Sequence, residues 1–189
     1  MRVLALLSAL LVASASAAEP PLTLNWDDQT PEGDEEELDR QYEAYYAGLQ
    51  AQLDAQQSQS LFDGGQAGGY AGVAEGSALD AMPQLGTFNV VEDLDGRKVR
   101  IPGFVLPFEY SASGEITEFL LVPYFGACIH TPPPPPNQVV YVTAEKPAPL
   151  GEQWGAIWAI GVLRAKSKLN DLGDAAYTLE FESWEQYEG

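Results

Sequence analysis

The stretch that decides the fold is Lys98-Val-Arg-Ile-Pro-Gly-Phe-Val-Leu-Pro-Phe108. Its first four residues alternate polar and apolar side chains, which is the period of a half-buried β-strand. Pro102-Gly103 then interrupts the alternation, and apolar residues resume at Phe104. A proline-glycine pair inside a strand indicates a bulge or a barrel corner, because proline cannot donate to the strand ladder and glycine permits a sharp bend. We therefore expect a strand that bends strongly within a small β-domain.

Short strands lie on both sides of this stretch at regular intervals, separated by turn sequences such as Asp93–Gly96 and Ser111–Gly114. The candidate strands are Thr87–Val91, Ile116–Val122, Val139–Val142, Gly155–Leu163 and Ala176–Phe181. The continuous apolar run at Phe119–Val122 predicts burial on both faces, and Gly161 predicts a bend. About five or six short strands with such spacing indicate a mainly β fold. We expect a small OB-like antiparallel β-barrel, with a β-sandwich as the alternative.

A helix is expected upstream, from Asp34 to about Ser58. Asp34 can serve as its N-cap, and the glutamates Glu35–Glu37 suit the positive end of the helix dipole. One apolar stripe runs along one face of this helix and is formed by Leu38, Tyr42, Tyr45, Leu49 and Leu53. Such a stripe is typical of a helix that packs on its own domain or forms a weak coiled coil. A dedicated partner site is the alternative.

Composition divides the chain into four parts. Residues 1–18 resemble a secretory signal peptide, with a basic start, a short apolar run and a small-residue cleavage region. Residues 19–60 form an acidic arm with the amphipathic helix, residues 61–82 a glycine-rich linker, and residues 83–189 the OB-like domain. No later run is long and apolar enough to span a bilayer. We therefore expect a periplasmic protein without a transmembrane segment in its mature chain.

The charge of the chain restricts its ligands. The whole sequence has a formal net charge of −19. Removal of a leader containing Arg2 would leave 8 basic and 28 acidic residues, so 8 − 28 = −20. This charge argues against nucleic acid and against anionic membrane surfaces, and it permits cations and basic partners.

The segment Tyr124–Gln138 contains the single cysteine, Cys128, and the single histidine, His130. One cysteine cannot form an internal disulfide, so an exported thiol must be buried, paired with another chain, metal-bound or chemically used. Side chains two residues apart in extended chain point to the same side. Thiolate and imidazole suit zinc or copper rather than magnesium or calcium. Carboxylates such as Glu109 or Glu118, water or a second protein would have to complete the site.

The rest of this loop is expected to act as a scaffold. Gly126 permits a sharp turn or a close approach, and Asn137 can bind free backbone groups. The five prolines predict a stiff polyproline II rod: Pro132, Pro133, Pro134, Pro135 and Pro136. Two other interpretations stay open: a purely structural loop with a buried cysteine, and a Cys/His thiol enzyme with Asn137 as the nearest orienting residue. A dithiol oxidoreductase is excluded because a resolving cysteine is absent from the sequence.

With these motifs in view, the sequence resembles a bacterial family of exported proteins classed as a domain of unknown function. The resemblance rests on the signature Val-Pro-Tyr-Phe-Gly-Ala-Cys-Ile-His-Thr-Pro-Pro-Pro-Pro-Pro-Asn-Gln at residues 122–138, on residues 96–107 and on the arm at Trp26. It implies a periplasmic accessory of metal or envelope transport, found beside ABC-transporter genes linked to zinc supply. No catalytic residue is assigned.

The loop residues and the resemblance together predict a zinc-binding protein with Cys128 and His130 as ligands. The resemblance further implies an accessory role, with a membrane transporter or envelope protein as partner. The alternative is a non-catalytic interaction module. In that case the proline rod and the helix stripe would bind an envelope partner.

Overall fold

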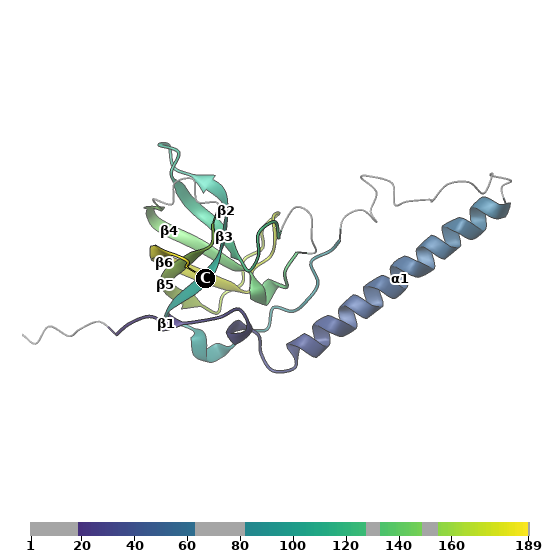
Figure 1. The fold of residues 1–189 in the computed structure, drawn as a ribbon, viewed down its shortest axis with the longest axis horizontal. Helices are drawn as coiled ribbons and strands as arrows, with labels where there is room; N and C mark the ends of the chain where they lie inside the picture. Colours follow the sequence, from purple (N-terminus) through teal and green to yellow (C-terminus); the bar gives the residue numbers. More distant parts are fainter. Residues whose placement is uncertain (1–18, 63–81, 128–132, 149–154, 189) are drawn as a thin grey trace, which may run out of the picture.

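The computed structural model describes residues 19–62, 82–127, 133–148 and 155–188, and it shows a β-barrel with one long helix (Figure 1). The strands are β1 (Leu22–Thr23), β2 (Lys98–Tyr110), β3 (Ile116–Val122), β4 (Val140–Ala148), β5 (Ile157–Arg164) and β6 (Tyr177–Gln186). The helix is α1 (Asp34–Phe62), and the short 3₁₀ helices are η1 (Asp27–Gln29), η2 (Glu92–Leu94) and η3 (Pro136–Gln138).

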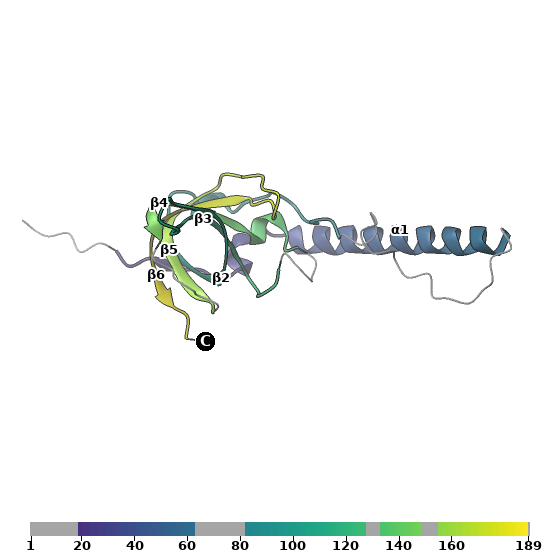
Figure 2. The ribbon, with the colours of Figure 1, turned by 90° about the horizontal axis from the view of Figure 1, so that it is seen from above.

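Five strands close the barrel in the order β2, β3, β4, β6, β5, with β5 pairing again with β2 (Figure 2). The prediction of an OB-like barrel with an N-terminal helical arm is therefore confirmed, and the β-sandwich alternative is wrong. One detail also needs correction. The β4–β6 pair is parallel, so the barrel is mixed rather than purely antiparallel. The reason is that β5 does not pair with β4, the strand before it in the chain, but lies between β2 and β6. The next strand, β6, returns antiparallel to β5 and therefore runs in the same direction as β4.

The corner predicted at Pro102-Gly103 is the point where β2 changes partners. Residues up to Gly103 pair with β5, and residues from Phe104 pair with β3. A Cβ atom at Gly103 would lie 2.8 Å from the Leu121 side chain and 3.0 Å from the Trp26 ring. Glycine is therefore required by the close approach of neighbouring layers. The strand itself continues through the pair, so the ladder is bent rather than broken.

The bend predicted at Gly161 is also present. The β5–β6 register shifts between Ile160 and Gly161, which is a β-bulge. A Cβ atom at Gly161 would lie 2.2 Å from the Glu180 carbonyl oxygen, so only glycine fits without a shift of backbone. Bulges of this kind increase the local twist, which helps a short strand to follow the wall of a barrel.

Apolar side chains alternate between the inside of the barrel and its outer face. Val99, Ile101, Phe119, Leu121 and Val142 belong to the inner core and are fully buried. Leu120 and Val122, the alternate residues of β3, belong to a second buried cluster on the outer face. The burial of residues 119–122 on both faces is therefore confirmed.

The strand predicted at Thr87–Val91 is wrong, because this segment forms no ladder. Val90 and Val91 nevertheless pack against the inner core. The Val91 N–H donates to the Tyr177 hydroxyl at 2.6 Å, and that hydroxyl donates to the Gln29 carbonyl at 2.9 Å. A buried tyrosine thus pairs one backbone group of this segment, the Val91 N–H, that a strand partner could have paired.

The predicted helix is present, but it stands away from the barrel (Figures 1 and 2). Among the described residues, Asp34 and Gln41 in its first two turns accept hydrogen bonds from residues 86–89 and from Asn137. The expected packing of the stripe on its own domain is wrong beyond these turns, since Tyr42, Tyr45 and Leu49 stay half-exposed. None of the described helices combines the length and apolarity that a bilayer crossing requires.

The expected signal peptide and most of the expected linker lie outside the described residues. The arm is tied to the barrel through β1, where Leu22 and Thr23 pair with Val99 and Arg100 in parallel. Gln29 is fully buried behind this pairing. The part of the arm that precedes α1 therefore belongs to the packing of the barrel, whereas α1 extends away from it.

Candidate functional site

The outer face of β2, β3 and β4 carries a half-buried polar cluster beside the second apolar cluster. Glu118 and Tyr141 are diagonal neighbours on β3 and β4, because Tyr141 pairs with Leu120, two residues after Glu118, and Glu118 pairs with Thr143. The Tyr141 hydroxyl donates a short hydrogen bond to the Glu118 carboxylate. Tyr141 is 4% exposed. The strand register thus holds a carboxylate and a phenol together at the edge of an apolar patch.

Two further contacts define the surroundings of Tyr141. The Lys168 Nζ lies 5.1 Å from the centroid of the Tyr141 ring, in a cation–π arrangement. The ring centroids of Phe108 and Tyr141 lie 5.4 Å apart. Burial, followed by the hydrogen bond to Glu118, raises the pKa of Tyr141 far above its usual value of 10.0. Tyr141 therefore stays protonated and remains a hydrogen-bond donor to Glu118 at neutral pH.

Both predicted carboxylates lie in the β2–β3 hairpin. Glu109 and Glu118 are cross-strand partners, with a register shift on either side of Glu109. Glu109 is exposed, whereas Glu118 is half-buried and hydrogen-bonded. Like charges at opposite positions repel each other, so a bound cation at this position would relieve a cost already present in the sheet. Of the two, Glu118 is the carboxylate that is held in place.

The start of the predicted loop packs on the same outer face. Gly126 has a φ of +82°, which favours glycine and confirms a sharp turn. Ala127 is 2% exposed and belongs to the same buried cluster as Tyr141 and Val139. The predicted ligands Cys128 and His130, together with Pro132, lie outside the described residues. The loop thus leaves the barrel from the cluster that contains Tyr141.

The return of the loop is fixed by prolines. Pro133 is half-buried, and Pro134, Pro135 and Pro136 are buried. Pro135 has the extended φ and ψ of −53° and 151°, while Pro136 begins η3. The extended part of the proline run therefore ends at Pro135, one residue earlier than expected. A buried run braces the loop and does not present these three rings to a partner.

Gln84 joins the proline run to the segment before β6. Its amide nitrogen donates to the carbonyl oxygens of Pro134 and Asp174, at 2.8 and 2.9 Å. Its amide oxygen accepts from the Asp174 N–H at 2.7 Å. Next to it, a Cβ atom at Gly86 would lie 2.6 Å from the Pro135 Cβ, and Gly86 has a φ of +114°. Only glycine allows this segment to lie against the prolines.

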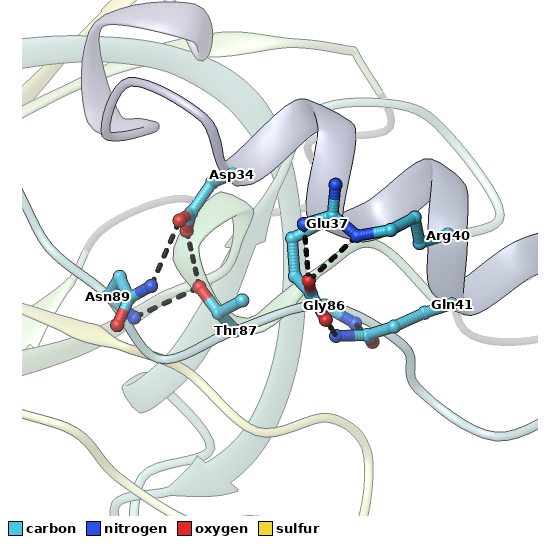
Figure 3. A network of polar contacts seen from close by, with 7 residues as sticks. All are labelled: Asp34, Glu37, Arg40, Gln41, Gly86, Thr87 and Asn89. Atoms are coloured by element: carbon cyan, nitrogen blue, oxygen red, sulfur yellow. Dashed lines mark hydrogen bonds and ion pairs between the residues drawn. The ribbon is translucent and has the colours of Figure 1, made fainter.

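Asn137 ties the loop to the start of α1. Its side-chain nitrogen donates to Asp34 at 2.9 Å. Asp34 also accepts hydrogen bonds from Thr87 and from Asn89, the latter at 2.9 Å (Figure 3). Asp34 is the first residue of α1, and its carboxylate accepts hydrogen bonds from these side chains rather than from the backbone of the first helical turn. Its expected role as N-cap is therefore wrong. The role expected of Asn137 also changes, because its partner here is a side chain.

Sequence reasoning missed Tyr141, Lys168 and Gln84. Tyr141 was included in the predicted strand Val139–Val142, and its polar partner becomes visible only through the strand register. Gln84 and Lys168 lie in irregular segments, where a sequence has no periodicity that would place them. The acidic residue at position 118 was the available signal, since a glutamate inside an otherwise apolar strand needs a partner.

Among the described residues, no group of three or more histidine, cysteine, aspartate or glutamate side chains is arranged to hold a metal ion. The donor set of the sequence, with one thiolate, one imidazole and a fixed carboxylate, fits the ligands that zinc takes in proteins.

These features define a five-stranded OB-like barrel protein with a helical arm and a buried proline run at Pro134–Pro136. Residues 26–186 match the model of DUF3299, described as a protein of unknown function, and the chain belongs to this family. A crystal structure of a DUF3299 family protein from Pseudomonas aeruginosa PAO1 is similar, with a TM-score of 0.60 and 28% identity. The match covers 90% of this chain and 100% of that chain. No match was found among curated proteins.

Membership of a domain-of-unknown-function family is thereby confirmed. The signature sequence of the loop and the neighbourhood of transport genes, which the resemblance implied, stay predictions.

Proposed function

We propose that this DUF3299 protein is an exported binding protein for a transition metal, foremost zinc, and serves an envelope or ABC-type transport system as a periplasmic accessory. Cys128 supplies a thiolate, His130 an imidazole nitrogen and Glu118 a carboxylate oxygen. Zinc accepts these three kinds of ligand in tetrahedral sites, with a fourth position for water or for a partner's ligand. Copper is the alternative metal, because soft sulfur and imidazole ligands suit it as well.

The observation that carries the proposal is the hydrogen bond from Tyr141 to Glu118 across β3 and β4. Carboxylate ligands of metals are usually oriented by a hydrogen bond from a neighbouring group. Tyr141 is protonated at neutral pH and buried, so it can orient Glu118 without competing for the metal. Ala127, the residue before Cys128, packs in the cluster that contains Tyr141. The strongly negative chain supports a cationic ligand over an anionic one.

An open fourth position suits a protein that transfers its metal rather than one that uses it structurally. Structural zinc sites are closed by four protein ligands, whereas sites that exchange a ligand keep one position free. With one cysteine and one histidine in the sequence, the chain can supply few strong ligands of its own. This composition supports delivery to, or acceptance from, a transporter component that completes the site.

Competition with a chromogenic zinc chelator tests the proposal on the mature chain under reducing conditions. We expect one zinc per chain in the wild type, with at least about tenfold weaker binding in Cys128→Ser, His130→Ala and Glu118→Gln. Glu115→Gln is the matched control, because Glu115 is an exposed carboxylate at the β2–β3 turn. Equal affinity in the wild type and in Cys128→Ser would overturn the proposal. Zinc affinity equal to that of the wild type in Glu118→Gln alone would show that Glu118 is not a ligand, and it would favour Glu109 as the carboxylate ligand.

The interaction module is the second candidate, and α1 is the observation that favours it. Tyr46 is 53% exposed, and the stripe beside it is half-exposed along the helix. The buried Pro134–Pro136 do not support the part of this candidate that relied on the proline rod. Zinc affinity that is unchanged in all three variants, combined with loss of a co-purifying membrane partner in Tyr45→Lys, would favour this candidate over the first.

A further inference from the structure

Helix α1 is too long and too isolated to be explained by the barrel alone. It contains 29 residues, and a helix of that length spans about 43 Å. Its hydrogen bonds to the barrel side come from Asp34 and Gln41 among the described residues. Helices in water draw most of their stability from a face packed on something else. The half-buried stripe beyond Gln41, with the exposed Tyr46 beside it, is therefore the part of α1 that needs a partner.

The stripe has a symmetry that selects the partner. Its tyrosines form one aromatic group, with Tyr45 and Tyr46 rings 5.5 Å apart and Tyr42 and Tyr46 rings 6.4 Å apart. Around the midpoint between Tyr45 and Tyr46, apolar residues are placed at equal distances: Tyr42 mirrors Leu49, and Leu38 mirrors Leu53. An antiparallel pair of identical helices needs this pattern, because residue i of one copy meets residue j of the other and the reverse.

Charge favours the same arrangement. The first half of α1 carries six carboxylates and one arginine, whereas the second half carries Asp54 and is otherwise rich in glutamine, alanine and serine. In a parallel pair the two acidic halves would lie side by side and repel each other. In an antiparallel pair each acidic half lies against a nearly neutral half. The barrels, attached at the start of each helix, then lie at opposite ends.

We propose that α1 is a self-association element that pairs in antiparallel fashion with α1 of a second copy, with the apolar stripe as the contact. Of the six large side chains at this contact, Tyr46 is exposed and the other five are already half-buried, so the pair buries less area than a standard specific interface of about 1,600 Å². The dimer is therefore a weak one that forms at micromolar concentration. It is independent of the metal proposed above.

Sedimentation equilibrium of the mature chain tests self-association. We expect a concentration-dependent approach to twice the monomer mass, tightening at higher salt because like charges on the helices are screened. Tyr45→Lys should raise the dissociation constant by at least about tenfold, since a central aromatic is lost from both helices. Ala51→Lys is the matched control, because Ala51 lies on the opposite side of α1 and is exposed. Circular dichroism spectra of both variants should match that of the wild type, which would show that the fold is kept.

Disulfide trapping tests the orientation in a Cys128→Ser background. A mixture of Tyr42→Cys and Leu49→Cys chains should cross-link between the two variants. Each variant alone should not, because the like positions lie about 10 Å apart along an antiparallel pair. Cross-linking of each variant with itself would show a parallel pair and overturn the proposal. A monomer mass at all concentrations up to the millimolar range would overturn self-association altogether.

Discussion

Replacing Asp34 by alanine should lower the free energy of unfolding by about 3 kcal/mol. Asp34 is 8% exposed and accepts hydrogen bonds from Thr87, Asn89 and Asn137. A hydrogen bond to a charged group contributes about 1.5–3 kcal/mol, but exposed donors recover part of this by binding water. Asn89 is exposed and recovers most, whereas Asn137 is 3% exposed and is left without its partner.

Urea unfolding monitored by tryptophan fluorescence measures this loss. With a slope of about 2 kcal/mol per molar urea, the midpoint should fall by about 1.5 M. Asp39→Ala is the control, since Asp39 is an exposed carboxylate on the same helix. We expect its midpoint to stay within about 0.25 M of the wild type. The double variant Asp34→Ala/Asn137→Ala should be less destabilised than the sum of the two single variants, because each single change removes the same bond.

A midpoint for Asp34→Ala within the error of Asp39→Ala would refute this reasoning. The carboxylate would then contribute nothing beyond an ordinary surface charge, and the link between α1 and the loop would be a loose contact. Strict additivity in the double variant would refute the pairing with Asn137 in particular.

Three further outcomes follow from the same geometry. Gly161→Ala should destabilise the barrel by about 2–4 kcal/mol by thermal melting, against less than about 0.5 for Gly155→Ala, whose Cβ meets nothing. Stability should fall as pH rises above 10.0, because Tyr141 ionises there in the unfolded chain while its raised pKa keeps it neutral when folded; Tyr141→Phe should flatten that fall. Gly86→Ala should weaken zinc binding with Cys128 and His130 intact, because the added Cβ displaces Pro135. Unchanged zinc affinity would show that the packing of the proline run does not influence the metal site.

The barrel was predictable because its signals are local. Pro102-Gly103, Gly161 and the alternation within each strand mark bends and faces without any knowledge of the partner strands. The strand direction was less accessible. The residues of β4 and β6 do not indicate that the two strands run parallel. Their relative direction follows from the place of β5 in the sheet, where it lies beside β6 and β2 and not between β4 and β6.

Residues 87–91 show the opposite failure. Their apolar, β-branched composition is typical of a strand, but the segment is satisfied by the Tyr177 hydroxyl and by packing on the core. A side chain 86 residues away thus replaces the expected ladder. Local propensity cannot anticipate such a partner, because it scores a segment without its tertiary contacts.

The candidate site was predictable in its parts and not in its assembly. Glu118 and Gly126 were identified from residue type and position. Tyr141, which fixes Glu118, required the β3–β4 register. The helix stripe was visible in the sequence, and its lack of a partner in the barrel required the structure.

X-ray absorption spectroscopy of the zinc-loaded mature chain tests the central claim most directly. The account predicts one sulfur at about 2.3 Å and a mixture of nitrogen and oxygen at about 2.0–2.1 Å, with the sulfur shell absent in Cys128→Ser. A zinc shell made of oxygen and nitrogen alone in the wild type, unchanged in Cys128→Ser, would contradict it. Zinc would then be bound by surface carboxylates, and the loop would have another purpose.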